Sequence, residues 1–279
     1  MNPFQWFGTY IFTPIFYHPI LNLLVLFYKV FHFIRLPGDF GFAIIILTVF
    51  VRLLLHPFFK QQIESAKKLQ DLKPHLDRLS EKHKKDPKRL QQEQLKLYQA
   101  AGINPASGCL FMIIQIPIFL ALYNTLSSFL LTGGSAKVIA EINKVLYSPY
   151  LKIQTINPWF FGYNLALSPA KSGLWYYWLV PVITAFLQYL QVQVATPQTT
   201  TSGVKKSDSS SSAKAPEDKE DFQKAMNTQM KFIFPLMIGW FSYTLPIGLS
   251  LYWNIFSIFS IIQYRKINPK PLYEQKGNN

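Results

Sequence analysis

The chain alternates between long apolar stretches and shorter polar or basic segments. Residues 40–59 carry a single charge, Arg52, and residues 109–131 and 174–194 carry no formal charge at all. A helix needs about 20 residues to cross the roughly 30 Å of hydrocarbon in a bilayer. Each of these three stretches therefore predicts one membrane-spanning helix.

The last apolar stretch, residues 232–262, is too long for one upright span. Pro246 and Gly248 lie near its middle, and this pair of residue types favours a turn. The stretch therefore predicts two helices that form a hairpin. The expected fold class is all-α, a polytopic membrane protein with a bundle of five transmembrane helices.

The N-terminal part, residues 4–36, is apolar and aromatic but lacks the early basic region and the cleavage site of a signal peptide. Its apolar residues recur at helical spacing after Ile20. This stripe predicts an N-terminal amphipathic helix that lies in the membrane interface, with a sixth span as the alternative. Its members are Leu21, Leu24, Val25, Tyr28, Phe31 and His32.

The polar segments between the spans differ in character. Residues 60–106 hold two leucine-rich stripes that predict a helical hairpin, in which Pro74 is expected to kink or break the first helix. Residues 196–226 are of low complexity and predict a flexible loop. The predicted segments are 1–39 (N-terminal extracytoplasmic), 40–59 (span 1), 60–106 (cytoplasmic hairpin), 107–131 (span 2), 132–173 (extracytoplasmic loop), 174–195 (span 3), 196–226 (loop), 227–245 (span 4), 248–267 (span 5) and 268–279 (tail).

Charge sets the expected orientation of the chain. It has 28 basic and 14 acidic residues, a net charge of +14, and only one cysteine, which excludes an internal disulfide framework. Of the basic residues, 21 fall in residues 60–106, 196–231 and 263–279, against six in residues 1–39 and 132–173. Because cytoplasmic loops carry the excess of Lys and Arg, the N-terminus is expected outside and the C-terminus inside.

Arg52 is the principal candidate for a functional residue. A charge inside a span costs a few kcal/mol by insertion scales, so such a side chain normally faces protein or water. The alternative is that Arg52 snorkels to the interface. Thr48 lies one turn earlier on the same face. No carboxylate occurs in any predicted span, so an incoming acidic group is a possible counter-charge for Arg52.

Other polar residues in the predicted spans ordinarily make hydrogen bonds between helices. Together with Arg52 they could line a wet, positively charged cavity. The five histidines show no metal-ligand spacing, and the chain has neither a Gly-rich phosphate loop nor a serine-nucleophile elbow. An enzyme and a cofactor are therefore not expected. The polar residues in the predicted spans, other than Arg52 and Thr48, that could line this cavity are Gln115, Asn124, Gln188, Gln191, Asn254, Ser257 and Gln263.

Four sequence blocks resemble the YidC membrane protein insertases: ILTVFVRLLLHPFFKQQ, LQDLKP, GINPASGCLFMIIQIPIFLALY and GLSLYWNIFSIFSIIQ. The resemblance runs from about residue 20 to residue 267 and is to the short bacterial form, which lacks a large periplasmic domain. It implies an insertase and chaperone that inserts nascent membrane proteins and helps them fold. It further implies a groove that is open to the cytoplasm and to lipid and closed to the outside.

The resemblance also implies roles for single residues. Arg52 would project into the groove, where Thr48 and Gln188 match groove positions and Trp253 matches an aromatic residue that meets substrate. The hairpin would be mobile and help to recruit substrate. Family members often have Asn four residues after that aromatic, whereas this chain has Ser257 there and Asn254 directly after Trp253. At this amide position the chain departs from the family pattern.

The partners implied by the resemblance are nascent membrane proteins, the ribosome, the Sec translocon, the signal recognition particle pathway and the lipid bilayer of a bacterial plasma membrane. Three alternatives remain open. An anion transporter should show repeated halves with broken helices, which the sequence lacks. An assembly chaperone that does not insert its clients has no distinguishing sequence feature. The basic hairpin could also contact nucleic acid.

Overall fold

The computed structural model describes residues 8–83, 86–102, 107–130, 135–195 and 229–267. These residues are mostly helical, as the sequence predicts. The strands among them are β1 (Trp159–Phe160) and β2 (Tyr163–Asn164), which pair as a short antiparallel hairpin. The predicted flexible loop and the C-terminal tail lie outside the described residues.

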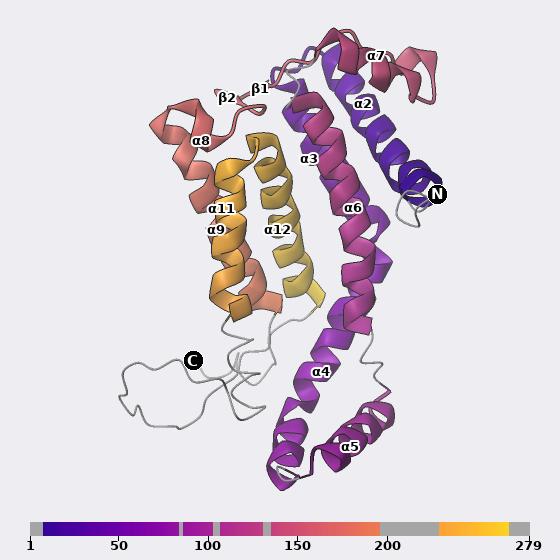
Figure 1. Ribbon diagram of the computed structural model, residues 1–279, viewed down its shortest axis with the longest axis vertical. Coiled ribbons are helices and arrows are strands. Elements are labelled where there is room, and N and C mark those ends of the chain that lie inside the picture. Colours follow the sequence, from indigo (N-terminus) through magenta and orange to yellow (C-terminus); the bar gives the residue numbers. More distant parts are fainter. Residues whose placement is uncertain (1–7, 84–85, 103–106, 131–134, 196–228, 268–279) are drawn as a thin grey trace.

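The N-terminal segment comprises a π-helical stretch, η1 (Gly8–Tyr17), and helix α2 (His18–Phe33). The predicted apolar stripe of α2 is buried, with Leu21 and Leu24 both 0% exposed. It packs against α3 (Asp39–Leu54), and η1 packs against α6 (Ser107–Leu130). In Figure 1, α2 runs alongside these helices rather than across the end of the bundle. This placement favours the sixth span over an interfacial helix.

Helix α3 ends earlier than the predicted first span. Helix α4 (His56–Lys82) follows it directly, and the two are bent by 65°. Pro57 explains the break, because proline has no N–H to donate and its ring clashes with the carbonyl four residues earlier. At the start of α4 the same residue is tolerated, since the first N–H groups of a helix have no internal partner.

Helix α4 and helix α5 (Pro87–Ala100) occupy the predicted hairpin segment and contact each other. Pro74 lies inside α4, which continues through it, so of the two expected outcomes, a kink or a break, the break is absent. Helix α5 begins where Asp86 accepts a hydrogen bond from the backbone N–H of Arg89, at 3.1 Å. This is a side-chain N-cap, and it explains the start of α5 after the Asp86–Pro87 pair.

The C-terminal half contributes α9 (Leu179–Ala195), α11 (Phe234–Thr244) and α12 (Ile247–Ile267). The turn predicted around Pro246 is confirmed, because α11 ends and α12 begins on either side of it. Figure 1 shows α9, α11 and α12 as one group and α2, α3 and α6 as the other. Helix α12 packs against both α9 and α3 and so joins the two groups.

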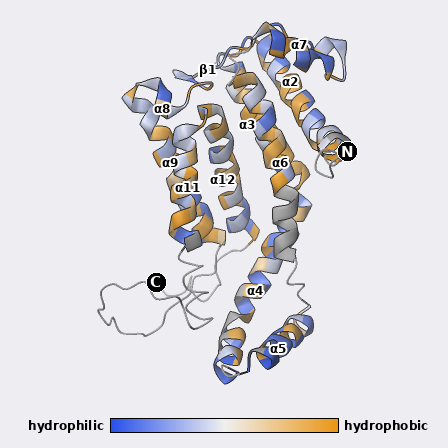
Figure 2. Cartoon of the chain, in the orientation of Figure 1, coloured by the Kyte–Doolittle hydropathy of each residue, from blue (hydrophilic) through white to orange (hydrophobic). Residues whose placement is uncertain are grey.

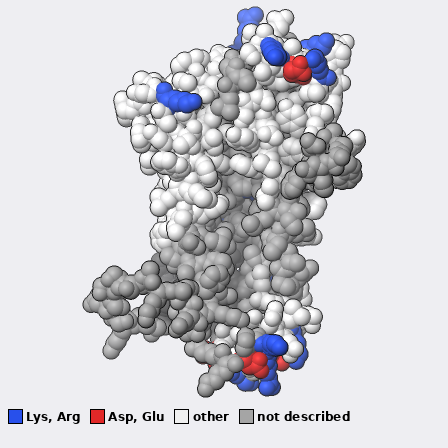
Figure 3. All heavy atoms as spheres, in the orientation of Figure 1, with Lys and Arg blue, Asp and Glu red and all other residues white. Residues whose placement is uncertain are grey.

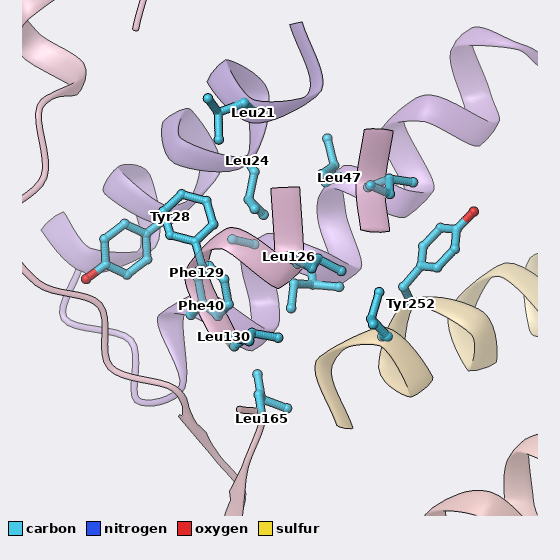
Figure 4. Close-up of a cluster of buried hydrophobic side chains, with 14 of the residues drawn as sticks. Leu21, Leu24, Tyr28, Phe40, Leu47, Leu126, Phe129, Leu130, Leu165 and Tyr252 are labelled. Atoms are coloured by element: carbon cyan, nitrogen blue, oxygen red, sulfur yellow. The ribbon is translucent and has the colours of Figure 1, made fainter. Parts of the chain in front are cut away.

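The segment between α6 and α9 covers one end of the bundle (Figure 1). The backbone N–H groups of Ile247 and Gly248, at the start of α12, donate to the carbonyls of Leu167 and Leu165 at 3.0 Å each. Leu165 also belongs to a cluster of buried hydrophobic side chains, part of which is drawn in Figure 4, and α2, α3, α6 and α12 contribute to this cluster. Besides the β-hairpin, the covering segment contains α7 (Ala136–Lys144), η2 (Pro149–Leu151), α8 (Pro169–Ser172) and η3 (Trp175–Trp178).

Several helices are long and apolar enough to cross a membrane. They are Tyr10–Phe33, Trp175–Ala195 and Ile247–Ile267, to which the bent α3–α4 pair adds a fourth if it forms one span. Helix α11 is shorter, as is the apolar part of α6, Ile116–Leu130. Apolar residues dominate the bundle in Figure 2, and on the face in Figure 3 the coloured charges gather at its two ends. The chain is thus a multi-pass membrane protein.

The Phe160 ring fits against Gly38 and Gly41 at the start of α3, because neither glycine has a side chain that would occupy the space of the ring. A Cβ atom added at Gly41 of α3 would lie 2.1 Å from Phe160 Cδ2. We therefore expect Gly41→Ala to lower the free energy of unfolding by about 1–3 kcal/mol, as overpacking does. Gly8→Ala, with nothing within 4 Å of the added atom, should change it by less than about 0.5 kcal/mol. Thermal unfolding in detergent measures both.

A double variant separates this clash from other effects of the substitution. If the ring is the obstacle, adding Phe160→Ala to Gly41→Ala should cost less than the sum of the two single changes. Strict additivity would contradict this account of the contact.

Candidate functional site

Arg52 lies in the last turn of α3, and its side chain is turned towards α12. It is 4% exposed. One terminal nitrogen, Nη1, donates to Gln263 Oε1 at 3.4 Å. The other, Nη2, donates to the Phe256 carbonyl at 3.3 Å and to the Ser260 hydroxyl. Snorkelling to the interface is therefore not the arrangement found, since the guanidinium is enclosed between helices.

Two aromatic rings cover the guanidinium. Its central carbon lies 3.7 Å from the ring centroid of Phe256 and 4.1 Å from that of Phe59. Phe59 belongs to the first turn of α4, so the bend after α3 is what places it beside Arg52. A cation over an aromatic face is attracted by the ring quadrupole, more strongly when water is excluded. The rings thus replace part of the hydration that Arg52 loses on burial.

No acidic side chain of the described residues pairs with Arg52. The ion pairs found in these ranges join other residues, close in sequence to one another. The Arg52 Nε–H has no hydrogen-bond partner in the same part of the chain. Removing one partner of a buried ion pair is strongly destabilising, because a charge is left uncompensated. Among the described residues, neutral acceptors and aromatic rings hold Arg52 in this uncompensated state.

A pocket adjoins Arg52 between α3, α6 and α12. Thr48 lines it together with Arg52, as the shared face predicts, and is 1% exposed. The Thr48 hydroxyl donates to the Ile44 carbonyl at 2.7 Å, within its own helix. Most of the remaining lining is apolar: it includes Leu55, Ile118 and Leu122.

Gln188 and Trp253 lie in other contacts of α12. Gln188 Nε2 on α9 donates to the Ser257 hydroxyl at 3.1 Å, and both residues are buried. The Trp253 ring stacks on Phe119 of α6, with centroids 5.8 Å apart and planes inclined by 7°. Ser257, at the position where the resemblance leads us to expect Asn, therefore accepts a hydrogen bond from the Gln188 amide. Asn254 Oδ1 is buried and has no partner among the described residues.

The predicted site residues are thus brought together only in part. Arg52 and Thr48 share a pocket. The Gln188–Ser257 hydrogen bond and the stacking of Trp253 on Phe119 are two further contacts of α12, apart from that pocket. The side chain of Gln115 lies outside the described part of the structure. The alternative of hydrogen bonds between helices fits Gln188, and it fits a further buried set in which Ser242 bonds Thr184 at 3.2 Å and Ser250 at 2.7 Å.

Sequence reasoning missed Ser260, Phe256 and Phe59 as neighbours of Arg52. One signal was available for the serine. Polar residues recur every third position in α12, at Ser257, Ser260 and Gln263, and residues three apart share a helix face. The rings carry no such signal, because phenylalanine is abundant throughout the chain.

Comparison of the chain with known proteins shows which family it belongs to. Residues 31–272 match the family described as "60Kd inner membrane protein". The membrane protein insertase YidC of Chlamydia caviae is 30% identical over 246 residues, which is 88% of this chain and 27% of the relative. The chloroplastic ALBINO3-like protein 2 of Chlamydomonas reinhardtii is 32% identical over 236 residues, 81% of this chain and 49% of the relative.

A third relative agrees with these two. The chloroplastic inner membrane protein ALBINO3 of Arabidopsis thaliana is 30% identical over 258 residues, 88% of this chain and 51% of the relative. The chain thus spans between about a quarter and about a half of the length of the relatives it matches. Because the match covers nearly all of the described helices, the chain belongs to the 60Kd inner membrane protein family, which includes the YidC membrane protein insertases.

Proposed function

We propose that this chain inserts nascent membrane proteins into the bilayer and assists their folding, as a non-enzymatic insertase and chaperone. The observation that carries the proposal is Arg52, a buried guanidinium held by neutral groups. On the face in Figure 3 the coloured charges gather at the two ends of the bundle. A charge at such depth in a membrane protein is a functional-site candidate by default. The family match supplies the class of activity.

The proposed substrate is a short acidic segment followed by an apolar helix. Arg52 attracts the acidic segment, because a carboxylate can accept two parallel hydrogen bonds from a guanidinium. The apolar helix then leaves the bundle into lipid along α9 and α12. The outward side chains of α9 support this path, since Val182 is 64% and Phe186 59% exposed.

Two sources of free energy make a nucleotide unnecessary in this mechanism. Burial of the substrate's own apolar helix supplies the larger share, as apolar area leaves water. The membrane potential adds about 2.3 kcal/mol per elementary charge per 100 mV for acidic residues that cross. The chain itself supplies a place where the acidic segment exchanges water for protein donors, and Thr48, Gln188 and Trp253 are the proposed further members of that groove.

We propose that α3, α6, α9, α11 and α12 span the membrane, with the α4–α5 hairpin and the C-terminus in the cytoplasm, and that the N-terminal helix Tyr10–Phe33 is the candidate for a sixth span. The segment that covers the other end supports closure towards the outside, because its backbone bonds to the start of α12. The hairpin is the proposed contact for substrates and the ribosome, since residues 60–106 carry eleven Lys and Arg. The Sec translocon and the signal recognition particle pathway are further proposed partners.

Removal of the guanidinium tests the proposal. We expect Arg52→Ala to lower the insertion of a single-span substrate with an acidic N-terminal segment by roughly tenfold or more. A hydrogen bond to a charged group contributes about 1.5–3 kcal/mol, and 1.4 kcal/mol is a factor of ten. Arg52→Lys, which keeps the charge, should largely restore insertion. The measurement is protease protection of the substrate in liposomes that contain the purified protein.

Three outcomes of this experiment differ in meaning. Full activity of Arg52→Ala on several acidic substrates would contradict the attraction of charge and leave the insertase. A folded native chain that binds the substrate without inserting it would favour the assembly chaperone. Loss of insertion in both the Ala and the Lys variants would assign Arg52 a geometric role that needs the planar guanidinium.

The proposed orientation predicts a labelling pattern. In a background with Cys109→Ser, Lys144→Cys on α7 should react with a membrane-impermeant maleimide in intact cells. Lys82→Cys, at the end of α4, should react only after permeabilisation, because α4 and α7 lie at opposite ends of the bundle (Figure 1). The reverse pattern would overturn the orientation. Gly8→Cys labels from outside if the N-terminal helix is interfacial, and only after permeabilisation if it spans.

A further inference from the structure

The acceptors around Arg52 share one chemical property, which is that none is charged. Nη1 and Nη2 donate to an amide oxygen, a backbone carbonyl and a hydroxyl, all supplied by α12. A carboxylate that approached Arg52 would take the same donors, and it would add the attraction of opposite charges and the two parallel bonds of an Arg–carboxylate pair. The three oxygens of α12 therefore occupy the position of a ligand that can replace them.

His56 fixes the orientation of the Gln263 side chain. Arg52 can only donate, so the oxygen of the Gln263 amide must face it, and the amide nitrogen points away. That nitrogen, Nε2, lies 2.9 Å from His56 Nδ1 at the start of α4. Because Nε2 donates, Nδ1 must accept, and the proton of the neutral imidazole lies on its other nitrogen. The chain of contacts runs from the imidazole through the amide to the guanidinium.

We propose that Ser260 and Gln263 act as a neutral latch on Arg52, which the carboxylate of an arriving substrate displaces, and that His56 is the residue that positions the latch. This inference rests on the proposed function and deepens it. When no substrate is bound, the latch holds the Arg52 guanidinium against α12. Because the latch is neutral, Arg52 can still bind an acidic segment. A permanent carboxylate in the same place would compete with every such substrate.

The incomplete hydrogen bonding of Arg52 supports a replaceable latch over a purely structural contact. Buried polar groups in native proteins are nearly all paired, and each exception calls for an explanation. The Arg52 Nε–H is such an exception within the described ranges, and Arg52 also lines the pocket beside Thr48. A guanidinium that only joined α3 to α12 would gain stability from a fixed carboxylate on α12, yet Ser260 and Gln263 stand there instead.

The test replaces the side-chain amide of Gln263 by a carboxylate and compares two substrates. Gln263→Glu keeps the shape of the side chain and gives Arg52 a permanent counter-charge. Purified variants in liposomes would receive a single-span protein with an acidic N-terminal segment, and the same protein with its Asp and Glu replaced by Asn and Gln. Gln154→Glu in the covering segment, the same chemical change at an exposed position at the other end of the bundle, is the matched control.

The expected result is a change of specificity. Gln263→Glu should lower insertion of the acidic substrate at least tenfold and leave the neutral substrate within about twofold of the native chain, since 1.4 kcal/mol corresponds to a factor of ten. Gln263→Leu, which removes the amide oxygen, should insert the acidic substrate at least as well as the native chain. His56→Phe should act in the direction of Gln263→Leu. Gln154→Glu should leave the ratio of the two substrates unchanged.

Other outcomes overturn the latch. Equal losses for both substrates in Gln263→Glu would show a structural defect, because misfolding does not distinguish them. If Arg52→Ala impairs the acidic substrate selectively and Gln263→Glu does not, the latch is wrong and the proposed function stands. If the native chain inserts neither substrate, the proposed function fails and the latch fails with it.

Discussion

The burial of one positive charge, with no acidic partner among the described residues, is the constraint on which the centre of this structure depends. Arg52 is 4% exposed, and the described residues offer it neutral oxygens and two aromatic rings. Helix α12 must therefore lie against α3 with its polar face inward, and α4 must turn back so that Phe59 reaches the guanidinium. The bend at Pro57 and the serine-rich face of α12 both serve this arrangement.

Helix α12 holds the two halves of the bundle together by different means on its different faces. Towards α9 it uses the Gln188–Ser257 hydrogen bond, and towards α6 it uses the stacking of Trp253 on Phe119. In a membrane, apolar helices gain little from hiding apolar surface from lipid, so packing and hydrogen bonds between helices carry the association. The same helix thus supplies the contacts that stabilise the fold and those that hold Arg52.

The two ends of the molecule differ in how closely their segments are packed. At one end a covering segment bonds to the start of α12 through backbone groups, and Phe160 fits closely against Gly41. At the other end α4 leaves at an angle of 65°, and the α4–α5 hairpin contacts the rest through few elements. The end near Arg52 is therefore the one at which a change of helix positions disturbs the least packing.

The sequence by itself determined the helical membrane class, the turn at Pro246, the family, and Arg52 as the residue to explain, because hydropathy, chain-breaking residues and isolated charges act locally. Only the tertiary structure decided that the N-terminal stripe packs along α3, that α4 runs through Pro74, and that Ser260 and Phe59 meet Arg52. These contacts join residues distant in sequence, and their partners are chosen by the packing of whole helices. No local pattern carries that information.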